Sequence, residues 1–263
     1  KIWNVRLVIR HLLLMTYYLI IKRDYRFYSV GAGPLDNWII RSWVRVILNR
    51  SKGIYVRDKK SLDFLLSIGV KKCLLRLGSD WILNLSKISP VKKANVLRVG
   101  LHLPSFNLHG HYRNSIDDVI EYLKGNHINY KLFYFKDFYK PSFFDASYEY
   151  LKSCSVEHTY TDYESPDQLV RHISCLDILI SNKLHCCIVG CSQGVKVLSV
   201  GVHEKTRRFF DQINYSENNR LTSENYDGFV SSQLPFLKVP EIPEDVSQSL
   251  VDMRDDLRKF VTL

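Results

Sequence analysis

The chain has 263 residues, of which 46% are hydrophobic and 24% are charged. This balance excludes disordered, collagen-like and coiled-coil proteins, and the length allows one large domain or two modest ones. The 37 Lys and Arg residues against 27 Asp and Glu give a net charge of +10. Residues 1–100 carry 20 of these basic residues and only 5 of the acidic ones, so the basic excess belongs to the first part of the chain.

The chain begins at Lys1, without an initiator Met and without a secretory signal. This start predicts a fragment, or a chain shortened at its amino end. Residues 12–21 form a ten-residue apolar run between Arg10 and Lys22. A membrane-spanning helix needs about 20 such residues. We therefore expect a buried helix here, and a basic helix lying on a membrane surface is the alternative.

Strands and helices alternate through the first part of the chain. The strand at residues 25–30 runs into Gly31-Ala32-Gly33-Pro34, a turn that glycine permits. The pattern predicts further strands at 53–56 and 72–77, and helices at 38–48 and 61–69. This β-α-β-α-β order is typical of a parallel α/β sheet.

The second part repeats the alternation after an expected linker around Ser89-Pro90 and Lys92-Lys93. Strands are expected at 96–103, 130–135, 177–180 and 195–200, and helices at 115–125, 147–152, 165–176 and 184–193. The predicted fold class is α/β, with two Rossmann-like, doubly wound parallel-sheet domains, the first truncated at its amino end. The predicted boundaries are 1–90 and 91–239, followed by an acidic amphipathic tail helix at 240–263.

The cysteines and histidines give no pattern of metal ligands. The chain has six cysteines and no CxxC pair, which indicates reduced, buried thiols in a cytoplasmic protein. His102, His109 and His111 follow one expected strand, and we expect them to line the mouth of a cleft. No metal site is predicted.

Cationic residues follow two of the expected strands in the second part. The stretch 178–185 reads as a buried strand, a turn with Asn182 and Lys183, and a helix start with His185. Lys205, Arg207 and Arg208 follow the next strand. Carboxyl ends of parallel strands share one edge, where helix N-termini present free amides, so an anion site is expected there. Taken alone, the local pattern favours a solvated Lys183 and a packing role for His185, and only the convergence of two cationic strand ends raises the anion site to equal standing.

An ordered set of short motifs extends over residues 25–210. In the second part they are Ser181-Asn182-Lys183-Leu184-His185, Gly194-Val195-Lys196-Val197-Leu198, and Lys205. Upstream they are Gly31-Ala32-Gly33-Pro34-Leu35, then Val56-Arg57-Asp58 with Ser61, Leu65 and Gly69, and Asp80. In this order the set resembles the polysaccharide pyruvyl transferase family.

The resemblance implies a two-domain fold like that of the GT-B glycosyltransferases. It also implies transfer of the pyruvyl group of phosphoenolpyruvate to a sugar as a ketal, with no metal and no further cofactor. Such chemistry needs a general acid, for which His185 is the candidate, and cationic clamps, for which Lys183, Lys205 and Arg207 are candidates. The other candidate substrate-binding residues are Asn182, Arg113, Arg57 and Asp58.

The implied setting is the assembly of a surface polysaccharide or exopolysaccharide in a bacterial cytoplasm. The expected acceptor is a glycan or lipid-linked oligosaccharide, with peripheral contact at the inner face of the membrane and no nucleic acid partner. Two alternatives stay open. One is a GT-B-type glycosyltransferase that uses a nucleotide sugar, and the other is an inactive glycan-binding remnant.

Overall fold

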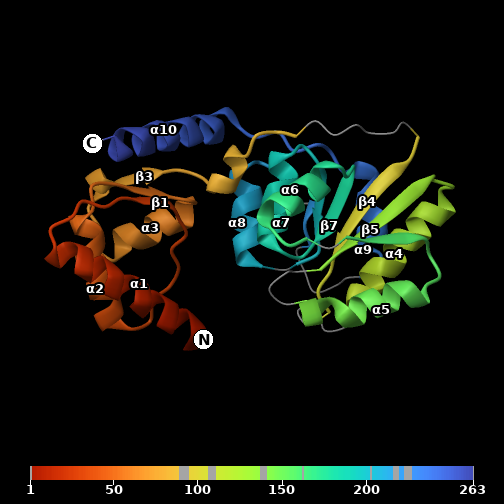
Figure 1. Ribbon diagram of the computed structural model, residues 1–263, viewed down its shortest axis with the longest axis horizontal. Helices are drawn as coiled ribbons and strands as arrows, with labels where there is room; N and C mark the ends of the chain where they lie inside the picture. The colour runs from red at the N-terminus through yellow and green to blue at the C-terminus, as the bar shows by residue number, and fades with distance from the viewer. Residues whose placement is uncertain are drawn as a thin grey trace. The chain divides into compact units, whose positions relative to one another are not determined.

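The computed structural model (Figure 1) describes residues 2–88, 95–105, 111–136, 141–161, 163–201, 203–215, 219–221 and 227–262. The chain forms two compact units. The first is Lys1–Trp81 with Glu244–Leu263, and the second is Ile82–Pro243. The units therefore divide near Trp81, and the expected linker at Ser89-Pro90 and Lys92-Lys93 lies outside the described residues.

The first unit is built on a parallel sheet with the strand order β1-β2-β3. Its strands are β1 (Phe27–Val30), β2 (Ile54–Val56) and β3 (Leu75–Leu77), the last preceded by the short helix η1 (Lys72–Leu74). The crossovers are α2 (Trp38–Arg50) and α3 (Lys59–Ser67). Ile54 and Val56 pack with Leu48 of α2 and Leu65 of α3, so both crossover helices cover one face.

Side-chain caps begin the two crossover helices. The Asn37 side chain accepts hydrogen bonds from the amides of Ile39 and Ile40 at the start of α2. Asp58 accepts from the Ser61 amide at 2.8 Å, so α3 begins at Lys59, two residues before the expected start. The local sequence therefore begins each helix with an acceptor that satisfies first-turn amides.

The first helix of the chain is α1 (Ile2–Ile20), which extends well before the apolar run on which its prediction rested. Leu12 is buried, and Thr16 accepts a hydrogen bond from the Trp43 indole of α2 at 3.0 Å. These contacts hold α1 against α2. Among the described residues, no helix is long and apolar enough to cross a membrane.

The helix α10 (Glu244–Val261), from the end of the chain, lies over the sheet of the first unit (Figure 1). Its Asp256 pairs with Arg26 and accepts a hydrogen bond from the Tyr28 hydroxyl at 2.8 Å. Met253 is fully buried beside Gly78, where an added Cβ would come within 2.7 Å of the Met253 sulfur. The acidic amphipathic helix predicted at 240–263 thus packs on the basic first unit.

The second unit contains a five-stranded parallel sheet with the order β6-β5-β4-β7-β8. The strands are β4 (Leu97–His102), β5 (Tyr130–Phe135), β6 (His158–Thr161), β7 (Ile178–Ser181) and β8 (Lys196–Ser199). The chain runs outward from β4 to β6 and then crosses back to the other side of β4. The order therefore reverses between β4 and β7, as at the switch point of a doubly wound sheet.

Helices cover both faces of this sheet, as Figure 1 shows. One layer holds α4 (His111–Gly125), η4 (Pro141–Phe144), α5 (Asp145–Ser153), α9 (Phe229–Gln233) and η6 (Leu234–Phe236). Helices α6 (Pro166–Ser174) and α7 (Leu184–Ser192) pack on the opposite face, while α8 (Glu204–Gln212) contacts α7. Ile178 and Ile180 point to the first layer and Leu179 to the second, the alternation of a strand buried on both faces.

The prediction of parallel α/β sheets is confirmed, although some helix boundaries differ and one strand was not expected. The expected helix at 115–125 begins at His111, so Ser115 is an interior residue whose hydroxyl donates to the His111 carbonyl. Strand β6 was not expected, because its sequence His-Thr-Tyr-Thr has no apolar run. The expected helix at 165–176 is α6, and Ser165 caps it by accepting from the Gln168 amide at 3.3 Å.

Replacement of Asp256 by Ala tests how α10 is attached. The partly buried Arg26 and the Tyr28 hydroxyl would both lose their partner, so we expect about 1.5–3 kcal/mol less stability for the first unit at neutral pH. All four tryptophans of the chain lie between residues 3 and 81. Urea unfolding followed by tryptophan fluorescence therefore reports on this unit.

The same variant has a defined pH dependence. Burial alone would raise the pKa of Asp256, but hydrogen bonds from Arg26 and Tyr28 outweigh it and lower this pKa below its usual value. A carboxyl group whose pKa is lower in the folded state than in the unfolded state stabilises the folded state at pH values above the unfolded-state pKa. This stabilisation is lost as the pH falls through the folded-state pKa. The difference between wild type and Asp256→Ala should therefore shrink in acid. Asp255→Ala, at a side chain that is 50% exposed, should change stability by less than about 0.5 kcal/mol.

Candidate functional site

Polar residues end three adjacent strands of the second unit. His102 of β4 pairs in register with Ser181 of β7, which pairs with Ser199 of β8. All three are buried, and the Ser181 hydroxyl lies 3.3 Å from His102 Nδ1. This polar row lies at the carboxyl edge of the sheet, beside the reversal of strand order. It forms the base from which the loops after β7 and β8 leave the sheet.

The loop after β7 carries three of the predicted site residues. The Lys183 amide donates to the Ser181 hydroxyl at 3.1 Å, and Asn182 between them is buried. Lys183 is half-buried at the N-cap of α7, and His185 is exposed in its first turn. A lysine side chain has no acceptor, so it cannot cap the first-turn amides of α7. Cation, imidazole and helix N-terminus are thus brought together, as expected for an anion site.

The loop after β8 lies directly against the loop after β7. The Val200 amide donates to the Ser181 carbonyl at 3.1 Å. A Cβ on Gly201 would come within 2.8 Å of the Asn182 carbonyl oxygen and 3.2 Å of its Cα. Only glycine fits here without moving the backbone. The absence of a side chain at Gly201 therefore lets the two strand ends approach each other.

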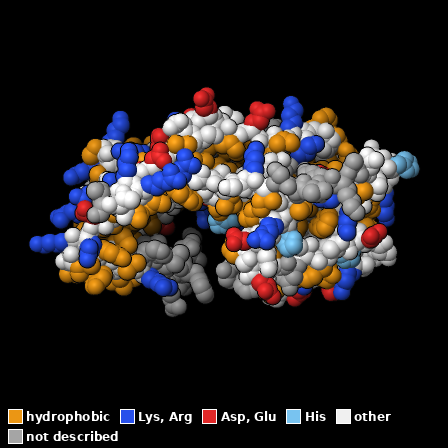
Figure 2. Space-filling model, turned by 45° about the horizontal axis from the view of Figure 1, so that its top comes forward, with side chains coloured by type: hydrophobic (Ala, Val, Ile, Leu, Met, Phe, Trp, Pro, Cys, Tyr) orange, Lys and Arg blue, Asp and Glu red, His pale blue; other side chains and the backbone are white. Residues whose placement is uncertain are grey.

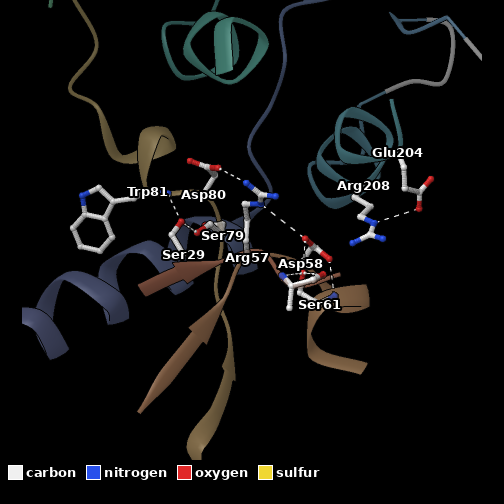
Figure 3. Close-up of polar contacts among 10 residues, drawn as sticks. Ser29, Arg57, Asp58, Ser61, Ser79, Asp80, Trp81, Glu204 and Arg208 are labelled. Atoms are coloured by element: carbon white, nitrogen blue, oxygen red, sulfur yellow. Dashed lines mark hydrogen bonds and ion pairs between the residues drawn. The ribbon is translucent and has the colours of Figure 1, made fainter. Parts of the chain in front are cut away.

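Helix α8 begins after this loop and carries the remaining predicted cations. Lys205 is exposed in its first turn, and Arg207 is half-buried. Glu204 binds Arg207 at 2.7 Å and Arg208 at 3.2 Å, the second pair being drawn in Figure 3. The two arginines are therefore ion-paired along their own helix. Sequence analysis gave Glu204 no role, although its i, i+3 and i+4 spacing to the arginines predicts these pairs.

The structure places the histidines after β4 differently from the expectation. His102 is the last residue of β4, and only 1% of its surface is exposed. Its ring packs edge-on against Phe144, with centroids 4.7 Å apart. It therefore lies beneath the loops and does not line a cleft mouth. His111 begins α4, and His109 lies outside the described residues.

Arg113 lies within α4, although its expected position was a loop. Its guanidinium lies over the Tyr150 ring of α5 at 5.2 Å and is 6.0 Å from the Tyr112 ring. Cation–π contacts of this kind hold a planar cation against the helix surface. A substrate-binding role for Arg113 stays a prediction.

The first unit has its own polar cluster at the carboxyl edge of its sheet (Figure 3). Arg57 follows β2, and its guanidinium lies 3.3 Å from Asp80 and 3.9 Å from Asp58. The Ser61 hydroxyl binds the buried Asp58, while a Cβ on Gly31 would come within 2.6 Å of Arg57. Asp58 therefore caps α3 and also helps to hold Arg57. Substrate binding by Arg57 and Asp58 stays a prediction.

Ser29 has a structural role in this region that its sequence did not predict. Its hydroxyl donates to the Ser79 carbonyl at 2.8 Å and accepts from the Trp81 amide at 2.8 Å, contacts visible in Figure 3. Ser29 has φ of +59°, a left-handed conformation that is uncommon for a residue with a Cβ. The strand thus bends at Ser29 to bind the segment that carries Asp80. No sequence motif indicates this conformation.

The cysteine cluster of α7 is buried in the second unit. Burial raises the pKa of the Cys187 and Cys191 thiols, so both stay protonated and unreactive near neutral pH. Within the described ranges, no three His, Cys, Asp or Glu side chains are grouped so that they could hold a metal ion.

Two Rossmann-like units with parallel sheets define an α/β protein of the GT-B-like class, and solved structures support this fold. A protein described as a UDP-N-acetylglucosamine 2-epimerase from Listeria monocytogenes matches with a TM-score of 0.65 at 11% identity, over 92% of this chain and 65% of that chain. HepE from Anabaena, solved with UDP and glucose, matches with a TM-score of 0.60 at 11% identity, over 96% and 75% of the two chains. A UDP-GlcNAc 2-epimerase from Neisseria meningitidis, bound to UDP-GlcNAc, matches with a TM-score of 0.62 at 12% identity, over 94% of this chain and 73% of that chain.

The chain spans less than two thirds of the length of the Listeria structure. No curated protein matches the sequence. The family is nevertheless clear, because the model of the polysaccharide pyruvyl transferase family matches residues 4–204. The chain belongs to the polysaccharide pyruvyl transferase family, as the ordered motifs predicted.

The close approach of the loops after β7 and β8 is tested by Gly201→Ala. The new Cβ would push against the backbone of Asn182, so we expect a loss of about 1–3 kcal/mol in the stability of the second unit. Gly125→Ala is the matched control, because no heavy atom lies within 4 Å of a Cβ at that position. Calorimetric unfolding should show a lower Tm for Gly201→Ala alone. Equal Tm values for both variants and wild type would contradict the close approach.

Proposed function

We propose that the protein transfers the pyruvyl group of phosphoenolpyruvate to a sugar of a polysaccharide precursor, where it forms a ketal. The observation that carries this proposal is the match to the polysaccharide pyruvyl transferase family across residues 4–204. The match includes the loop after β7, with Lys183 and the exposed His185, and it ends at Glu204, one residue before Lys205. Phosphoenolpyruvate is the donor substrate, and the proposal includes no metal and no further cofactor.

The donor would bind at the carboxyl edge of the second sheet. Phosphoenolpyruvate carries a phosphate and a carboxylate, and both need cationic or amide donors. Lys183 at the N-cap of α7 and the amides of the first turn of α7 supply such donors on one loop. Lys205 on α8 is the second clamp. Arg207 is already bound to Glu204, so its guanidinium would have to bind the donor and Glu204 at the same time.

The reaction requires a proton at the methylene carbon of phosphoenolpyruvate. His185 is exposed in the first turn of α7, beside the proposed phosphate clamp, and imidazole gives up a proton near neutral pH. Once the carbon is protonated, one sugar hydroxyl adds and the phosphate leaves with the electrons of its C–O bond. The second hydroxyl then adds, and the two hydroxyl protons are released.

The acceptor would be a glycan, carried on a lipid in a bacterial cytoplasm at the inner face of the membrane. The carboxyl edge of the first sheet supports this choice, because it holds Arg57 between Asp58 and Asp80 with Trp81 next in the chain. Carboxylates and guanidinium groups bind sugar hydroxyls, and an indole ring can pack on a sugar face.

A GT-B-type glycosyltransferase is the second candidate, because solved relatives of this fold contain UDP or UDP-sugars. Its donor would be a nucleoside diphosphate sugar bound at the same sheet edge. Calorimetry with phosphoenolpyruvate and with UDP-sugars separates the two candidates. A ligand at 100 times its Kd stabilises the protein by about 2.7 kcal/mol. Stabilisation by phosphoenolpyruvate is expected; stabilisation by UDP-sugars alone would favour the glycosyltransferase, and none by either would favour a glycan-binding remnant.

Replacement of His185 by Ala tests the general acid. Phosphate release from phosphoenolpyruvate, measured with a soluble glycan acceptor, should fall about 10²–10⁴-fold. The KM for phosphoenolpyruvate should change little, because the clamps remain. His172→Ala, on α6 beside Phe135, is the control and should keep its activity. Full activity of His185→Ala would remove His185 from the mechanism.

A further inference from the structure

Helix α1 has an apolar face that points away from the unit it belongs to. Ile9, Leu13, Tyr17 and Ile20 follow one another at spacings of four, four and three residues, which places them on one side of the helix. Their exposed fractions run from 38% at Ile9 to 73% at Ile20. The opposite side of α1 is the packed one, since Leu12 is buried and Met15 and Leu19 contact the same core cluster.

Basic residues accompany this outer face. Arg10 is exposed one position after Ile9, and Lys22 and Arg23 are exposed directly after the helix. The helix Ile2–Ile20 contains no Asp or Glu. Figure 2 shows hydrophobic and basic side chains next to one another on the first unit. We call the set Ile9, Arg10, Leu13, Tyr17, Ile20, Lys22 and Arg23 the α1 outer face.

We propose that the α1 outer face binds the surface of an anionic lipid membrane. Apolar side chains would enter the boundary between headgroups and acyl chains, and the flanking cations would meet lipid phosphates. The helix would lie along the surface and not cross it, in keeping with its hydropathy. The inference deepens the proposed function and rests on it for the lipid-linked acceptor, because it names the surface on which that acceptor would be carried.

The charges favour a membrane over a second copy of the chain. A two-fold contact between two α1 outer faces would bring Arg10, Lys22 and Arg23 of both copies together. The helix α1 has no acidic residue to offset that repulsion, and Asp24, which follows Arg23, already pairs with Lys52 at 3.5 Å. An anionic bilayer supplies the opposite charge and accepts the apolar side chains in the same plane.

Vesicle flotation without any substrate is the test. The whole chain should float with vesicles of phosphatidylcholine and phosphatidylglycerol, and much less with phosphatidylcholine alone or at high salt. Ile20→Glu should lower the partition coefficient by at least about tenfold, because it removes an apolar side chain that would enter the membrane and adds a charge of the same sign as the lipid. Arg10→Ala should lower it about fivefold, the equivalent of about 1 kcal/mol per cation.

Two matched variants serve as controls. Val261→Glu introduces the same charge at a side chain of α10 that is also 73% exposed, and Arg258→Ala removes an exposed cation from α10. Both should float like wild type. Tryptophan fluorescence and circular dichroism should show that Ile20→Glu remains folded, since an exposed site has no packing to lose.

Several results would overturn the proposal. One is that the chain floats with neutral vesicles as well as it does with anionic ones. Another is that Ile20→Glu and Val261→Glu reduce flotation equally. A third is a dimer that Ile20→Glu dissociates, while neither the wild-type chain nor the variant binds vesicles. Failure of the proposed reaction is a separate result, because phosphate release is measured with a soluble acceptor and no lipid. A chain that floats but releases no phosphate would keep this inference and remove the proposed function.

Discussion

The register of three neighbouring parallel strands places every loop of the candidate donor site. His102, Ser181 and Ser199 lie in one row at the carboxyl ends of β4, β7 and β8. Because the three strands end at one level, the loops after β7 and β8 leave the sheet side by side. Gly201 then lets these loops touch. The position of each cation on α7 and α8 thus follows from hydrogen bonding that begins in the strands.

Much of this arrangement could be predicted from the sequence, because buried parallel strands appear in it as short, continuously apolar runs. The run Ile178-Leu179-Ile180 is apolar on both faces, and β5 has the predicted bounds 130–135. Strand β6 could not be predicted in this way, since an edge strand with His, Thr and Tyr is neither continuously apolar nor clearly alternating. Its place is fixed by pairing with β5, which is a tertiary effect.

The candidate site was predicted more fully in its residue types than in their contacts. Lys183 and His185 occupy the strand end and helix start that their motif indicated. Arg207 was predicted to bind substrate, but Glu204 binds both Arg207 and Arg208. A loop sequence shows which charges are present and leaves open which charge pairs with which. The i, i+3 and i+4 spacing to Glu204 indicates these two pairs once all three residues are known to lie in α8.

The first unit shows how a small sheet can hold a precise polar cluster. Its strands have only three or four residues, too few to fix the loops by ladder hydrogen bonds alone. Two further devices supply the constraint. The Ser29 hydroxyl binds Ser79 and Trp81 on either side of Asp80, and Asp256 of α10 holds Tyr28 of β1 and Arg26 directly before it. Strand β1 is thus held at its start by α10 and near its end by the loop after β3. The basic first unit therefore depends on an ion pair whose carboxylate comes from the acidic helix at the end of the chain.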